Sequence, residues 1–144
     1  MTAPLAVTIT RDLAAPIEAV WRAWTDAAAV VRWMKCAPDI VLAFDNWRPA
    51  TGTRFTSSMS KPGAWAMRGS GEFLIVEPPR LLAYRLDANP EIGAPPTEVR
   101  VELTPRRSGT RVVVVHTGLP DESMCRVIED GWSSSLTMLG REPF

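Results

Sequence analysis

The spacing of apolar residues changes twice within the first third of the chain. Leu5, Val7 and Ile9 alternate with small or polar residues, and this period of two predicts a β-strand. Pro16 suits the first position of a helix, and apolar residues then recur every three or four positions as far as Trp24. The pattern therefore predicts a strand followed by an amphipathic helix.

A second short helix and a series of strands follow. Asp26 can cap a helix over residues 27–33. From residue 39 onward the apolar runs have the length and alternation of strands, and segments rich in Pro, Gly and Asn separate them. The predicted strands cover residues 40–44, 53–59, 64–77, 81–86, 98–103 and 110–117, and residues 89–96 are predicted to form a loop.

The last part of the chain returns to helical spacing. Asp121 is a plausible cap for a long helix with one apolar stripe, formed by Met124, Ile128, Trp132, Leu136 and Leu139. Strands that are separate in sequence from the helices indicate an α+β domain. We expect one domain over residues 1–144, in which this helix covers the apolar face of a curved antiparallel seven-stranded sheet with Trp132 at the centre of the contact.

Composition and charge exclude several classes of protein. Sixteen basic residues balance sixteen acidic ones, so an electrostatic nucleic-acid binder is not expected. The apolar runs are too short to cross a membrane, and the N-terminal segment lacks the features of a signal peptide. Cys36 and Cys125 are far apart and are expected to be free thiols. We expect a cytoplasmic protein, and the excess of arginine over lysine suggests a bacterial one.

The single histidine does not predict a catalytic or metal site. His116 shares its side of the predicted strand with Val112 and Val114, so it should face inward and hydrogen-bond to a neighbour. As a general base it would require a carboxylate to orient it. One histidine and two separated cysteines do not have metal-ligand spacing. We therefore expect no metal and no cofactor.

Several sequence blocks, all in order, resemble one known family. They are Ala15-Pro16 with Val20-Trp21, Thr25-Asp26 with Arg32-Trp33-Met34, Asp45 with Arg48-Pro49 and Gly52, Gly71 with Pro78-Pro79 and Tyr84, Gly109 to Leu119, and Gly131-Trp132 with Leu136 and Leu139. Together they are similar to the family related to the activator of Hsp90 ATPase, within the START-like superfamily. The resemblance implies a helix-grip fold (START/Bet v1-like), which typically encloses a cavity between the curved sheet and the C-terminal helix.

Six Trp and six Met residues allow two interpretations of that interior. Large side chains from separate elements either pack as a solid core or line a cavity for an apolar ligand. In the second case we expect polar groups at the mouth of the cavity from Asp45 and Arg48, although these two could simply stabilise a turn. The ligand-binding side chains would be Trp33, Met34, Phe44, Phe55, Trp65, Met67, Tyr84, His116, Trp132 and Leu136.

Three functions remain open at this stage. The first is non-catalytic binding of a hydrophobic small molecule by a monomer or homodimer. The second is a cyclase- or lyase-type enzyme in the same cavity, which His116 beside a buried carboxylate would favour. The third is a chaperone-cofactor-like interaction module, which an exposed apolar patch on the convex face of the sheet or around Trp47 would favour.

Overall fold

The computed structural model describes residues 5–144, so the first four residues of the N-terminal segment considered above lie outside the described residues. The elements follow one another in the predicted order, with one strand, two short helices, six strands and a long helix. They are β1 (Leu5–Leu13), α1 (Ile17–Thr25), α2 (Ala27–Trp33), β2 (Val41–Asp45), β3 (Arg54–Lys61), β4 (Trp65–Glu77), β5 (Leu81–Leu86), η1 (Pro90–Ile92), β6 (Thr97–Arg106), β7 (Gly109–Leu119) and α3 (Glu122–Leu139).

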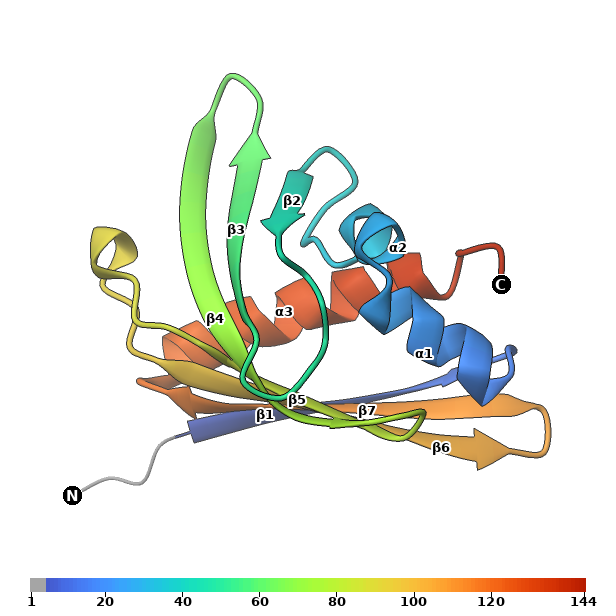
Figure 1. The fold of residues 1–144 in the computed structure, drawn as a ribbon. Helices are drawn as coiled ribbons and strands as arrows, with labels where there is room; N and C mark the ends of the chain where they lie inside the picture. The colour runs from blue at the N-terminus through green and yellow to red at the C-terminus, as the bar shows by residue number, and fades with distance from the viewer. Residues whose placement is uncertain (1–4) are drawn as a thin grey trace.

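All seven strands belong to one antiparallel sheet. Their order is β1-β7-β6-β5-β4-β3-β2, so each strand from β2 to β7 lies beside the next one in sequence, and β1 closes the order against β7. Figure 1 shows the β3–β4 hairpin rising away from the plane of β1, β6 and β7, which makes the sheet strongly curved. The curved sheet with a C-terminal helix is the predicted α+β helix-grip fold.

Some strands are longer than the apolar alternation predicts. β1 continues through Arg11 and Asp12 to Leu13, because Asp12 lies beside Arg111 of β7 and the two side chains pair at 2.8 Å. The backbone ladder therefore extends past the last apolar pair, where the sequence pattern has no signal. The predicted loop over 89–96 contains the short 3₁₀-helix η1, which Asn89 caps by accepting from the N–H of Glu91.

The two predicted helix caps are confirmed. The Asp26 side chain accepts a hydrogen bond from the N–H of Ala28 at 3.0 Å, and Asp121 accepts one from Met124 at 2.8 Å. Each carboxylate satisfies an N–H that has no partner within the helix, and its negative charge is favourable at that end of the helix dipole. None of the helices within residues 5–144 is both long and apolar enough to cross a bilayer.

The expectation that α3 alone covers the sheet is wrong. α3 packs on β1, β7 and α2, while α1 contacts β6 and β7, and α2 contacts β2. The helices therefore share the sheet: α3 and α1 lie against the β1, β7 and β6 side, and α2 lies against β2 at the opposite edge (Figure 1). Leu136 and Leu139 are fully buried, but Trp132 is only half-buried and not at the centre of the buried face.

β3 and β5 approach β4 closely at Gly71. A Cβ atom built on Gly71 would overlap the carbonyl oxygen of Arg85 and lie 2.5 Å from Cζ of Phe55. Only glycine leaves room for the Phe55 ring to lie across β4. The ring, 2 % exposed, thereby joins the buried core on the inner face of the sheet.

Candidate functional site

His116 lies on the inner face of the sheet, between Val7 of β1 and Val99 of β6. The indole N–H of Trp132 on α3 donates to Nδ1 of His116 at 3.0 Å. Since Nδ1 accepts, the ring proton is on Nε2, which lies 2.9 Å from Oγ1 of Thr97 and donates to it. The imidazole thus connects α3 to β7 and β6.

The surroundings of His116 keep the ring neutral. The side chain is 4 % exposed, and burial lowers its pKa to about 4. Its two hydrogen-bond partners are an indole and a hydroxyl, rather than the orienting carboxylate that a histidine base would require. The expectation of an inward-facing, hydrogen-bonded histidine is confirmed.

Tryptophan rings from all three helices meet above this histidine. Trp132 stacks on Trp24 of α1 with ring centroids 5.9 Å apart, and Trp24 meets Trp33 of α2 edge-on at 4.5 Å. The Trp33 N–H donates to the carbonyl oxygen of Ala23 at 3.0 Å. Nε1 of Trp24 is buried without a hydrogen-bond partner among the described residues. Trp33 and Trp132 are therefore packing residues that hold the helices together.

A second aromatic cluster fills the interior under β2–β5. Trp47, from the segment predicted as a turn, is 3 % exposed and stands at its centre. Its indole N–H donates to the carbonyl oxygen of Trp24 at 3.0 Å, which holds the turn against α1. The rings around it lie with centroids 4.3 to 5.7 Å from Trp47 and belong to Phe44, Phe55, Phe73 and Tyr84. These side chains form a packed core.

Tyr84 keeps a polar atom inside this core. Burial raises the pKa of its hydroxyl, which lies 3.9 Å from Sδ of Met34. A thioether is a weak acceptor, so the phenol is weakly satisfied here. Met34 is half-buried and packs against the core. The contact therefore runs from the buried Tyr84 to a residue at the edge of the core.

The inner face of the β3–β4 hairpin differs from the packed interior. Met59 and Met67 lie directly opposite each other and are both half-exposed, and Trp65, two residues along β4 from Met67, is 42 % exposed. The close neighbours of these two strands are β2 and β5, and α3 packs elsewhere. Of the predicted ligand-binding residues, Trp65 and Met67 are the ones that are accessible without packing against the buried core, whereas the half-buried Met34, Phe44 and Trp132 pack against it. Met59 is a further accessible apolar residue, which the predicted set of ligand-binding residues did not include.

Asp45 and Arg48 do not pair with each other. Nε of Arg48 donates to Oδ1 of Asn46 at 2.8 Å, which is a turn hydrogen bond. Asp45 lies at the end of β2, and its carboxylate accepts a long hydrogen bond, 3.4 Å, from Oγ1 of Thr56. It faces a hollow of about 420 Å³ on the outer face of the sheet, lined by Ala43, Phe44, Asp45, Thr56, Ser57, Ser58, Arg68 and Gly69.

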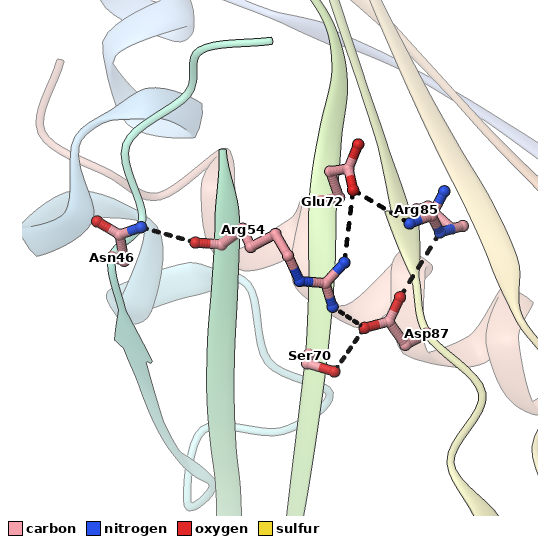
Figure 2. A network of polar contacts seen from close by, with 6 residues as sticks. All are labelled: Asn46, Arg54, Ser70, Glu72, Arg85 and Asp87. Atoms are coloured by element: carbon pink, nitrogen blue, oxygen red, sulfur yellow. Dashed lines mark hydrogen bonds and ion pairs between the residues drawn. The ribbon is translucent and has the colours of Figure 1, made fainter. Parts of the chain in front are cut away.

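The outer face also carries a polar network, shown in Figure 2. Arg54 donates to Glu72 and Asp87, and Arg85 pairs with the same two carboxylates. Ser70 donates to Asp87 at 2.7 Å, and this hydrogen bond, followed by the two arginines, lowers the pKa of Asp87. The alternation along β4 and β5 places these residues on one face, but their pairing depends on strand register, which the sequence pattern does not contain.

The described residues hold no candidate metal centre. Within residues 5–144, no group of three or more His, Cys, Asp and Glu side chains is arranged to hold an ion. Cys36 is exposed, Cys125 is half-exposed, and both are free thiols.

Comparison with known proteins places the chain in a family. Residues 14–142 match the family model described as Activator of Hsp90 ATPase homolog 1-like protein, and the chain belongs to this family. No curated protein sequence matches the chain.

Solved structures share the whole fold. A protein from Chromobacterium violaceum is 23% identical with a TM-score of 0.85, covering 98% of this chain and 100% of its own. The AHSA1 protein from Silicibacter pomeroyi is 21% identical with a TM-score of 0.81, covering 95% and 96%. The AHSA1-like protein from Aeromonas hydrophila is 26% identical with a TM-score of 0.77, covering 95% and 90%. The helix-grip fold of the chain is thus shared along nearly its full length.

Proposed function

We propose that this AHSA1-like protein binds an apolar small molecule against the inner face of the β3–β4 hairpin, without catalysing a reaction. The observation that supports this most directly is the accessible apolar surface formed by Met59, Met67 and Trp65, on the same face of the sheet as the packed core. We call these three residues the hairpin surface. Phe44 and Met34 are half-buried apolar residues that pack against the core.

The chemistry of the hairpin surface suits an apolar ligand of variable shape. Methionine side chains are flexible and polarisable, so they adapt to different partners. Tryptophan adds a large rigid contact area. A ligand that covered these side chains would remove apolar surface from water, at about 25 cal/mol for each Å² buried.

The alternatives have less support. The features that would favour a protein-interaction module were an exposed patch around Trp47 or on the outer face, but Trp47 is buried and the outer face carries the polar network around Arg54 and Asp87. An enzyme would be favoured by a carboxylate at His116, whose partners are Thr97 and Trp132. Binding without catalysis is therefore the function that we propose.

The experiment is a titration with the uncharged dye N-phenyl-1-naphthylamine, whose fluorescence rises in an apolar environment. The test variant is Met59→Asn/Met67→Asn. The matched control is Ser60→Asn/Ala66→Asn, which puts the same side chains at the next cross-strand pair, on the other face of the hairpin. We expect saturable binding to the wild type, at least tenfold weaker binding to the test variant, and unchanged binding to the control.

Two outcomes would contradict the proposal. One is the absence of saturable dye binding to the wild type. The exposed apolar hairpin surface would then favour a protein-interaction module instead. The other is equal binding to all three proteins, which would place the dye elsewhere. Circular dichroism spectra of both variants establish that the fold is retained.

A further inference from the structure

The outer face of β2–β4 carries a hollow that the proposed function does not use. Its volume is about 420 Å³, and a second hollow of about 240 Å³ adjoins it through Asp45 and Thr56, which line both. Residues 43, 45, 56, 58 and 68 are exposed and alternate with the inward-facing positions of their strands. The hollow therefore lies on the opposite side of the sheet from the hairpin surface.

Two opposite charges in this hollow are not neutralised by the protein. The nearby Arg54 forms ion pairs with Glu72 and Asp87 (Figure 2). Arg68 and Asp45 both line the hollow, yet neither takes part in an ion pair within residues 5–144. The protein thus supplies one cationic and one anionic group that are both available to a ligand.

The strand register fixes how far apart these charges are. Asp45 lies opposite Thr56, and Arg68 lies opposite Ser58, so β3 runs between the two charged residues. Two strand spacings across the sheet and two residues along it separate their Cα atoms by about 12 Å. Thr56 and Ser58, on the same face of β3, lie between the two charged residues and line the same hollow.

We propose that this hollow binds a small zwitterion of amino-acid or dipeptide size. The carboxylate of the ligand would pair with the guanidinium of Arg68, which can donate two parallel hydrogen bonds to it. The ammonium group would pair with the carboxylate of Asp45. The hydroxyl groups of Thr56 and Ser58 between them suit the amide or polar atoms of the ligand.

The arrangement of charges disfavours simpler ligands. A phosphate or dicarboxylate attracted to Arg68 would be repelled by Asp45, and a diamine attracted to Asp45 would be repelled by Arg68. The volume is at the lower end of the range for small-molecule sites, which matches a dipeptide better than a longer peptide. Because Asp45 and Arg68 are both exposed, we expect weak binding that is sensitive to salt.

The test uses glycylglycine as the probe, followed by the backbone amide signals of residues 43–45, 56–58 and 68–69 in two-dimensional NMR. We expect saturable shifts confined to these strands. N-acetylglycylglycine lacks the ammonium group, and glycylglycinamide lacks the carboxylate. Each should bind about fivefold more weakly, which corresponds to the loss of one exposed ion pair.

Variants assign each end of the ligand. Arg68→Gln should weaken the binding of glycylglycine about fivefold but should not weaken the binding of glycylglycinamide further. Asp45→Asn should also weaken glycylglycine about fivefold but should not weaken N-acetylglycylglycine further. Arg107→Gln, an exposed arginine in the β6–β7 turn, is the control. The proposal would be overturned if glycylglycine produced no saturable shifts, or if its binding did not change with either variant. Met59→Asn/Met67→Asn should leave these shifts intact, so the site is tested independently of dye binding.

Discussion

The indole N–H of Trp132 donates to Nδ1 of His116 across 3.0 Å, and this contact joins the long helix α3 to β7, the second strand of the sheet. His116 passes the connection on to Oγ1 of Thr97 on the neighbouring strand β6. The helix is thereby fixed to two strands by a polar chain in addition to its apolar stripe. Because the imidazole uses both ring nitrogens, its protonation would break the bond from Trp132.

The first prediction concerns the titration of His116, the only histidine of the chain. Burial lowers its pKa to about 4, against an ordinary value of 6.5. The imidazole signals in an NMR titration should therefore not move between pH 8 and pH 5.5. A midpoint near 6.5 would contradict the buried, hydrogen-bonded geometry.

The same shift makes stability depend on pH. Below pH 6.5 the unfolded chain binds a proton at His116 that the folded protein does not, so stability falls as the pH drops from 6.5 to about 4. The loss attributable to His116 is roughly 3 kcal/mol at the lower limit. Urea melts of the wild type and His116→Asn measure it, since the variant should lack this part of the pH dependence. Parallel pH profiles for the two proteins would contradict the prediction.

The second prediction separates the two roles of Trp132. Trp132→Phe keeps most of the ring that stacks on Trp24 but removes the donor to His116, so it should cost about 1–2 kcal/mol. Trp132→Ala also removes the stacked ring, and since the side chain is half-buried it should cost about 2–3 kcal/mol. Trp132→Phe should also raise the pKa of His116. An unchanged histidine titration in that variant would show that the bond does not hold the ring neutral.

The third prediction compares two glycines of β4. Gly71→Ala places a methyl group against the carbonyl oxygen of Arg85 and the ring of Phe55, neither of which can move freely, so it should cost about 3 kcal/mol or more. Gly69→Ala meets the hydroxyl of Ser57 at 3.0 Å, and that side chain can rotate away. Thermal melts should therefore show a much larger loss for Gly71→Ala. Equal melting temperatures for the two variants would contradict the close approach.

The fourth prediction concerns the polar network of the outer face. Ser70 and the arginines beside it lower the pKa of Asp87, so their contribution is present above pH 4 and is lost as the pH falls through the folded-state pKa. The groups are largely exposed, so Asp87→Asn should cost no more than about 1 kcal/mol. The cost should shrink in 1 M salt. A loss that salt does not reduce would mean that the network acts through packing rather than charge.

The sequence predicts most of the fold because its patterns are local. The alternation over residues 98–103 and the spacing of Leu136 and Leu139 each record which side of an element is buried, and both are confirmed by the structure. Strand ends are harder to predict, because β1 is extended by the pairing of Asp12 with Arg111, a contact between residues distant in sequence. The position of α3 on β1 and β7 depends likewise on how strongly the sheet bends, which no local pattern encodes.

The candidate site is only partly predictable for the same reason. Large side chains such as Phe55 and Tyr84 could line a cavity or fill it, and composition does not distinguish these arrangements. In the structure the space next to these two residues is filled by the side chain of Trp47, which packs against both rings. Trp47 comes from a segment that the sequence pattern predicts to be a turn. The predicted set of ligand-binding residues does not include Met59, although Met59 lies on the same inward-facing side of its strand as Phe55. Strand register, which pairs Met59 with Met67, provides the signal that the sequence lacks.

The most direct test of apolar binding at the hairpin surface is methyl NMR of protein labelled at its methionine methyl groups. The six methionines give few signals, which single Met-to-Leu variants assign. On titration with 1-decanol, an uncharged apolar ligand, we predict saturable shifts of the Met59 and Met67 methyl signals, while Met138, on α3, stays unchanged. Saturable binding that leaves the Met59 and Met67 signals in place, or no binding at all, would contradict the proposed function.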